Sequence, residues 1–241
     1  MGNYKKWEII GISLVVSLAC LWVAESTNPS GPDGPEQAEY APPSGRGPLV
    51  ILLSGISGLD RYRSYAADVA RLGYYTVLLK GNDFNPWNGK PGADDLRRAI
   101  VRAQSDAKAQ PGKAAVIGFS FGGGVSLTHA AGMPDLVSAI VVYYPMTNHI
   151  KDMRSFVAEF KVPILILAGE QDTYYYCCLI ESMRAMEAEA KAIRAPFELV
   201  VYKEARHAFN LEDSGKEYRA EDAADARQRA VKMLSQYQPL R

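Results

Sequence analysis

The sequence predicts an α/β protein with a mostly parallel central sheet and helices on both faces of that sheet. Short apolar runs of strand type alternate with segments whose apolar residues recur at helical spacing, which is the pattern of a parallel sheet buried on both sides. Serine, aspartate and histidine side chains with catalytic potential follow three of these runs. Sites in such sheets form beyond the carboxyl ends of the strands.

Length and composition narrow the class of protein. The 241 residues leave room for one sizeable domain and a short appendage. The 27 basic residues balance the 27 acidic ones, so no basic field indicates nucleic-acid binding and no acidic excess indicates disorder. The three cysteines are too few for a disulfide scaffold, and none stands in a C-x-x-C spacing.

Residues 1–25 predict export. Lys5 and Lys6 precede the apolar run Ile9–Ala24, as in a signal peptide or an uncleaved signal anchor. Small residues favour cleavage before Cys20, while lipidation of Cys20 is disfavoured because Ser17 stands where a lipobox usually has leucine. The rest of the chain is therefore expected to be periplasmic or secreted, and to touch a membrane only through this segment.

Residues 26–47 predict a linker, because prolines and glycines at this density disfavour a packed element. The folded domain is expected at residues 48–241. Its expected strands are Leu49–Leu53, Tyr75–Leu79, Ala114–Ile117, Val137–Tyr143, Val162–Ala168 and Phe197–Tyr202. Its expected helices are Tyr62–Leu72, Ala93–Ala109, a segment that includes Val125 and Leu127, Ile180–Ala195 and Glu221–Gln236.

The segment between the third strand and the helix after it fits the pattern G-x-S-x-G. Gly118 and Gly122 flank Ser120, as in the sharp strand-to-helix turn that exposes a nucleophilic serine in a strained conformation. The helix that follows would place its N-terminus beside the serine hydroxyl. The alternative is a glycine-rich turn that only allows the strand and the helix to pack.

An aspartate and a histidine follow Ser120 in the chain and could form a catalytic triad with it. Asp172 follows the strand Val162–Ala168, and His207 follows the last strand. A serine hydroxyl needs a base to take its proton, and a carboxylate orients that base. Alone, Asp172 would equally suit a helix N-cap and His207 an ordinary loop position. The order Ser120, Asp172, His207 at three strand ends instead favours a catalytic triad.

The same arrangement predicts an oxyanion hole made of two backbone N–H groups. One is expected from Phe121, directly after the serine, and the other from Ile56, just past the first strand. His129 is expected on a helix face, and His149 lacks a second ligand at metal spacing, so no metal site is predicted. The aromatic residues in loops after strands are candidates for pocket walls: Phe84, Trp87, Tyr143 and Tyr174.

Cys177 and Cys178 follow the acidic residue closely. Adjacent cysteines form either a vicinal disulfide, which suits an exported protein, or two buried thiols at the start of a helix. The second alternative is favoured from the sequence.

These motifs resemble the dienelactone hydrolase family of α/β-hydrolases. The resemblance runs from about Leu49 to Tyr237, and its carriers are Ser54–Leu59, Gly118–Gly123, Ala168–Asp172 and His207–Phe209. It implies an α/β-hydrolase fold without a large cap, hydrolysis of an ester or lactone, a small-molecule substrate and no cofactor.

Three positions depart from the family pattern. Ser120 stands where the founding members have cysteine, Gly55 where they have glutamate, and Asn210 and Leu211 where they have a substrate-binding arginine. The resemblance thus implies the fold and the triad but not dienelactone as the substrate. The expected function is a serine esterase that works through an acyl-enzyme intermediate. The alternatives are a non-catalytic binding protein and a small peptidase of the same fold.

Overall fold

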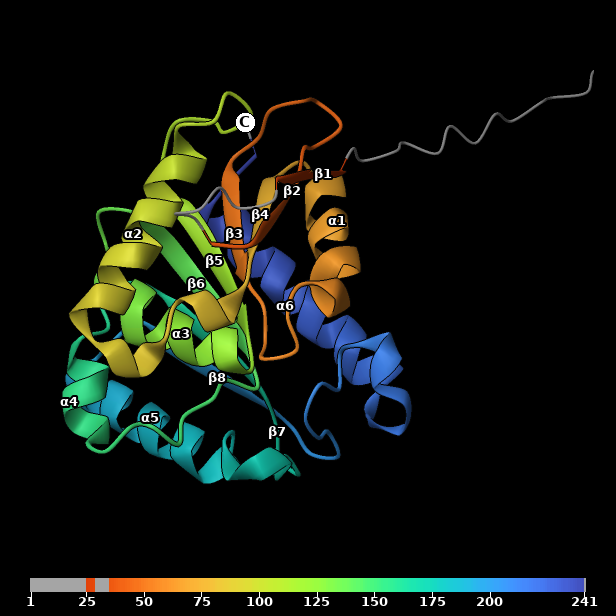
Figure 1. Ribbon diagram of the computed structural model, residues 1–241. Coiled ribbons are helices and arrows are strands. Elements are labelled where there is room, and N and C mark those ends of the chain that lie inside the picture. Colours follow the sequence, from red (N-terminus) through yellow and green to blue (C-terminus); the bar gives the residue numbers. More distant parts are fainter. Residues whose placement is uncertain (1–24, 29–34, 241) are drawn as a thin grey trace, which may run out of the picture.

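A computed structural model describes residues 25–28 and 35–240 of the chain (Figure 1). The predicted export segment and Cys20 lie outside the described residues. Within the described ranges, every helix is too short or too polar to cross a membrane.

In the part of the chain that the structure describes, the centre of the fold is an eight-stranded sheet in the order β1-β2-β4-β3-β5-β6-β7-β8. All neighbours from β4 to β8 run parallel, whereas β2 is antiparallel to β4 and β1 is antiparallel to β2. The strands are β1 (Glu25–Asn28), β2 (Gln37–Tyr40), β3 (Leu49–Leu53), β4 (Tyr75–Leu79), β5 (Ala114–Phe119), β6 (Val137–Tyr143), β7 (Ile164–Gly169) and β8 (Phe197–Tyr202). The expected α/β class with a mostly parallel sheet is therefore confirmed.

Helices cover both faces of this sheet (Figure 1). They are α1 (Arg63–Arg71), α2 (Lys90–Gln104), α3 (Phe121–His129), α4 (Met153–Ala158), α5 (Ile180–Ile193) and α6 (Ala220–Tyr237). Along β3, Leu49, Ile51 and Leu53 join the core beneath α2, α3, α4 and α5. Val50 and Leu52 join the opposite core beneath α1 and α6. This alternation explains why the strand is an unbroken apolar run.

The predicted linker, residues 26–47, is wrong where the structure forms β1 and β2. Gln37–Tyr40 forms β2, pairs with β4 and buries Ala38 and Tyr40. The prolines that suggested a linker flank this strand rather than interrupt it, and two buried side chains at alternate positions are enough to fix it on the sheet. The folded unit therefore begins before residue 48. The short helix α4 was also not predicted, because it offers less than two turns of periodic pattern.

Candidate active site

Ser120 lies at the sharp turn between β5 and α3. Its backbone has φ 50° and ψ −114°, a conformation that L-residues rarely adopt. A Cβ at Gly118 would lie 2.4 Å from the Ser126 hydroxyl, and one at Gly122 would lie 2.3 Å from the carbonyl oxygen of Leu53. Both flanking glycines are therefore required by close packing, as the G-x-S-x-G pattern predicts for this turn, the nucleophile elbow.

The three predicted triad residues come together at the carboxyl ends of β5, β7 and β8. His207 Nε2 lies 3.0 Å from Ser120 Oγ, and His207 Nδ1 lies 2.7 Å from Asp172 Oδ2. The backbone N–H of Tyr174 donates to the other carboxylate oxygen of Asp172 at 3.0 Å. With the buried carboxylate against Nδ1, the neutral imidazole carries its proton there and leaves Nε2 as an acceptor toward the serine.

Two aromatic rings hold the imidazole of His207. The ring of Tyr174 stacks on it with centroids 4.2 Å apart and planes within 7°, and the ring of Tyr144 lies 4.7 Å away at 60°. Tyr144 is buried and donates its hydroxyl to Asn210 Oδ1. Burial raises the pKa of Tyr144 well above its ordinary value, so this hydroxyl stays protonated and remains a donor.

A cavity of about 340 Å³ opens beside Ser120 and His207. It is lined by Ile56, Ser57, Arg61, Tyr62, Gln171, Thr173, Tyr174, Arg206, Ala208, Ser214 and Glu217 in addition to these two residues. Gln171, Thr173 and Arg206 flank triad residues in the sequence, which is a signal that could have identified them. Ser214 and Glu217 carried no such signal, because they reach the cavity through the fold of the irregular segment Glu212–Glu217.

Of the four aromatic residues predicted to line the pocket, one lines the cavity beside Ser120. Tyr174 lines the cavity, but Phe84 and Tyr143 are core residues. The hydroxyl of Tyr143 lies 2.9 Å from that of Tyr65 beneath α6. Trp87 is 58% exposed and packs its edge on Phe121, outside the residues that line this cavity. The prediction of pocket roles for Phe84 and Tyr143 was wrong, because a place at or after the end of a strand does not determine the direction of a side chain. For Trp87 it stays a prediction.

The two residues predicted as oxyanion donors belong to segments next to the serine or its cavity. Phe121 begins α3 directly after Ser120, and Ile56 lines the cavity from the loop after β3. The N-terminus of α3 adds its positive dipole end at the same place. A negative charge that develops beside Ser120 would therefore lie near the N-terminus of α3. That the N–H groups of Phe121 and Ile56 donate to it stays a prediction.

The remaining two histidines contact groups outside the triad. His129 in α3 is within 3.3 Å of the carbonyl oxygen of Asn85, and His149 Nε2 lies 2.9 Å from the hydroxyl of Thr128. Burial lowers the pKa of both imidazoles, so both are neutral near neutral pH. Their contacts agree with ordinary packing roles.

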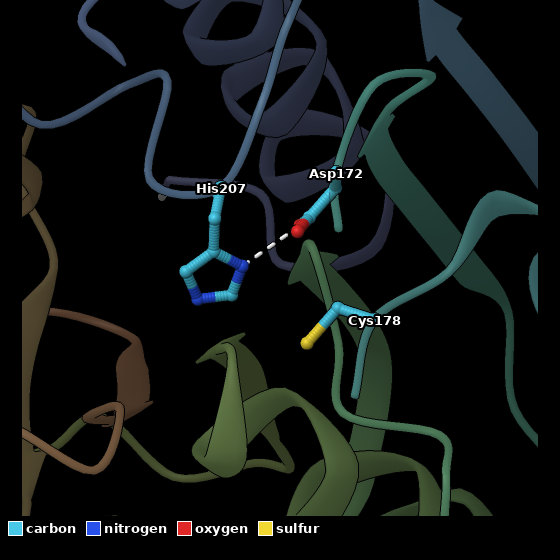
Figure 2. A group of neighbouring side chains, drawn as sticks. All are labelled: Asp172, Cys178 and His207. Carbon is cyan, nitrogen blue, oxygen red and sulfur yellow. Dashed lines mark hydrogen bonds and ion pairs between the residues drawn. The ribbon is translucent and has the colours of Figure 1, made fainter. Parts of the chain in front are cut away.

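Cys177 and Cys178 form a vicinal disulfide in the segment that connects Asp172 to α5. The favoured expectation of two buried thiols was wrong, and the alternative pairing holds. Figure 2 shows Cys178 beside Asp172 and His207, and ligand atoms of the three lie within 4.8 Å of one another. A sulfur held in a disulfide is no thiolate, so in this form the group lacks a sulfur ligand for a metal.

Sequence comparison places most of the domain in one family. The sequence profile of the dienelactone hydrolase family matches residues 86–238. A protein from Escherichia coli K12 described as a candidate carboxymethylenebutenolidase is 33% identical over 127 residues, which are 51% of this chain and 45% of that protein. The chain thus spans about half the length of the curated relatives it matches.

Solved structures with the same fold are more distant in sequence. A dienelactone hydrolase from Anabaena variabilis superposes with a TM-score of 0.67 at 21% identity, over 91% of this chain and 99% of that one. A dienelactone hydrolase-like promiscuous phosphotriesterase from metagenomic libraries gives 0.73 at 17% identity, over 89% and 98%. These likenesses support the fold.

Proposed function

The chain belongs to the dienelactone hydrolase family, and on that basis we propose that it is a serine hydrolase that cleaves an ester or lactone through an acyl-Ser120 intermediate. The observation that carries this proposal is the hydrogen-bonded series from Ser120 through His207 to Asp172. Each bond joins a nucleophile, a base and an orienting acid in the order that acyl transfer requires.

The reaction follows from these contacts. His207 Nε2 accepts the proton of Ser120 Oγ while that oxygen attacks the carbonyl carbon of the substrate. Asp172 stabilises the imidazolium, and the N–H groups of Phe121 and Ile56 donate to the tetrahedral oxyanion. The imidazolium then protonates the departing alkoxide, and a water activated by the same base hydrolyses the acyl-enzyme.

The cavity favours a substrate without a large net charge. Arg61 donates twice to Asp213, at 2.7 and 2.8 Å, and Arg206 lies 4.0 Å from Glu217. Each cation at the cavity wall therefore has its own acidic partner. We propose a neutral or weakly charged ester or lactone, cleaved without a cofactor.

Gly55 stands where the founding family members have glutamate, and this difference supports a mechanism with a serine rather than a cysteine nucleophile. A Cβ at this position would lie 2.3 Å from the hydroxyl of Tyr62 and 3.4 Å from Ser120 Cβ. Tyr62 thus occupies the space that an acidic side chain at position 55 would need. A serine hydroxyl is neutral at rest and has no need of the neighbouring glutamate that the family resemblance associates with a cysteine nucleophile.

Labelling with a fluorophosphonate probe tests the proposal. Wild-type protein should react once per chain at Ser120, and Ser120→Ala should not react. Ser57→Ala removes another hydroxyl from the same cavity and should label like the wild type. Equal labelling of Ser120→Ala, or no labelling of the wild type, would contradict the proposal and favour a binding protein instead.

We also propose that residues 1–25 direct export, as their sequence pattern predicts. Cell fractionation of the full chain should then find the hydrolase outside the cytoplasm or bound to the cytoplasmic membrane. A wholly cytoplasmic distribution would refute this part without affecting the proposed reaction.

A further inference from the structure

The side chain of Cys178 lies at the acid–base pair but takes no part in the proposed reaction. One ligand atom each from Asp172, Cys178 and His207 lies within 4.8 Å of the other two (Figure 2). Cys178 is 1% exposed, and Asp172 is also buried. A sulfur, a carboxylate oxygen and an imidazole nitrogen therefore converge at a protected point.

The disulfide controls whether this sulfur can bind anything. Cys178 is bonded to Cys177, which is partly exposed whereas Cys178 is not. A reductant therefore reaches Cys177 more easily, and Cys178 is the sulfur that departs from it. With a water-soluble phosphine, the S–S bond breaks and two S–H groups form. The phosphine supplies two electrons and becomes the phosphine oxide, while a water gives it the oxygen and gives the thiols its two protons.

We propose that the reduced chain binds a divalent cation of the zinc type at Asp172, Cys178 and His207. This donor set of sulfur, nitrogen and oxygen is one that zinc favours, and three protein ligands with a water as the fourth make a usual tetrahedral site. Ligand atoms around zinc lie about 3.5 Å apart. The three ligand atoms therefore have to move about 1 Å closer to one another, and reduction of the disulfide permits this movement at Cys178.

The existing hydrogen bonds indicate which atoms would ligate. Asp172 Oδ1 is held by the N–H of Tyr174, whereas Oδ2 faces His207 Nδ1 at 2.7 Å. His207 Nε2 faces Ser120 instead. The cation would take the place of the Nδ1 proton, between Oδ2, Nδ1 and the freed sulfur, and the thiol of Cys178 would lose its proton to solvent.

Binding of the cation at His207 Nδ1 would inhibit ester hydrolysis. This consequence rests on the proposed function. With the metal on Nδ1, the remaining proton of the imidazole sits on Nε2. That nitrogen can no longer accept the proton of Ser120, so the serine has no base. The disulfide would then protect the enzyme from metal inhibition, and reduction would expose it.

Cobalt titration tests the site without reference to turnover, because a thiolate bound to Co²⁺ gives a charge-transfer band in the near ultraviolet. All proteins carry Cys20→Ser, so that the cysteine outside the described residues cannot contribute. The oxidised chain should give no such band. The chain reduced with phosphine and then desalted without oxygen should give it, and so should Cys177→Ser without any reductant.

Cys178→Ser is the matched variant, because it also lacks the disulfide but leaves only the partly exposed sulfur. It should give no band, even after reduction. The proposal would be overturned if Cys178→Ser gave a band of equal strength. It would also be overturned if both Cys177→Ser and the reduced chain gave no band. If circular dichroism shows that Cys177→Ser does not fold, the reduced chain that keeps both Cys177 and Cys178 decides the question.

Ester hydrolysis gives the second measurement. Zn²⁺ should inhibit Cys177→Ser in proportion to the metal bound, a chelator should restore the rate, and the oxidised chain should keep its rate at the same Zn²⁺ concentration. If the cobalt band appears but Ser120→Ala still hydrolyses the ester, the metal site stands and the proposed catalytic role of Ser120 fails.

Discussion

Replacing Gly122 by alanine tests the elbow more directly than removing the serine. A Cβ at this position would lie 2.3 Å from the carbonyl oxygen of Leu53 and 2.4 Å from that of Ser54. Ordinary contact begins at 3.4 Å, so α3 and β3 have to separate by about 1 Å. Both oxygens belong to the backbone, one at the end of β3 and the other directly after it, and no side-chain rotation relieves the contact.

Two magnitudes follow from that displacement. Overpacking of a core costs about 1–3 kcal/mol, and the upper end is expected where backbone must move. For a domain of this size, about 3 kcal/mol lowers Tm by roughly 6–12 °C. A misplacement of about 1 Å at a catalytic group costs about a hundredfold in rate, and Ser120 stands only two residues away. Gly122→Ala should therefore lose both stability and kcat.

The assay measures Tm by calorimetry and kcat on a short p-nitrophenyl ester. Gly132→Ala is the control, because a Cβ there meets only the carbonyl oxygen of Glu159 at 3.7 Å. It should change stability by no more than about 0.5 kcal/mol and leave kcat unchanged. A Gly122→Ala variant as stable and as active as Gly132→Ala would refute the close packing at the elbow.

Three further predictions concern the residues around the serine. Asp172→Asn should fold normally but lower kcat by about 10⁴, since an amide would favour the wrong imidazole tautomer; a loss of less than tenfold would argue against its orienting role. Tyr174→Ala should lower kcat by up to about tenfold, because a stacked aromatic pair is worth about 0.5–1.5 kcal/mol, whereas Tyr175→Ala, at a ring that is 80% exposed, should not. The hydrogen bond from Arg61 lowers the pKa of Asp213, so this pair stabilises the fold above the unfolded Asp pKa of about 3.9 and ceases to do so as pH falls through the lower folded value. Asp213→Asn should reduce the free energy of unfolding in urea by no more than about 1 kcal/mol near neutral pH and by less at about pH 3; an equal loss at both pH values would contradict this.

The sheet and the triad could be predicted because local patterns determine them. The runs Leu49–Leu53 and Tyr75–Leu79 are buried at every position, and only a strand covered on both faces needs such a sequence. Ser120, Asp172 and His207 follow strands that are close neighbours in the order β5-β6-β7-β8. Their convergence follows from the parallel sheet.

Features that depend on side-chain direction or on distant packing could not be predicted in the same way. Phe84 follows β4 and Tyr143 ends β6, as Tyr174 follows β7, yet of the three only Tyr174 lines the cavity. The strand Gln37–Tyr40 is held by pairing with β4 and by burial of Ala38 and Tyr40, and four residues among prolines carry too short a pattern to predict either. The state of two adjacent cysteines depends on the loop around them, so their sequence left both alternatives open.

The antiparallel strand β2 has a consequence for handling the protein. It covers the edge of β4, and Glu39 accepts hydrogen bonds from the hydroxyl of Tyr75 and the ammonium group of Lys108, both at 2.9 Å. A recombinant chain trimmed to start at residue 48 would keep the whole triad but would leave one edge of the five-residue, apolar strand β4 unpaired. Open edges of this kind pair with other chains. Such a trimmed protein should therefore accumulate in inclusion bodies, whereas one that starts before Gln37 should remain monodisperse in size-exclusion chromatography.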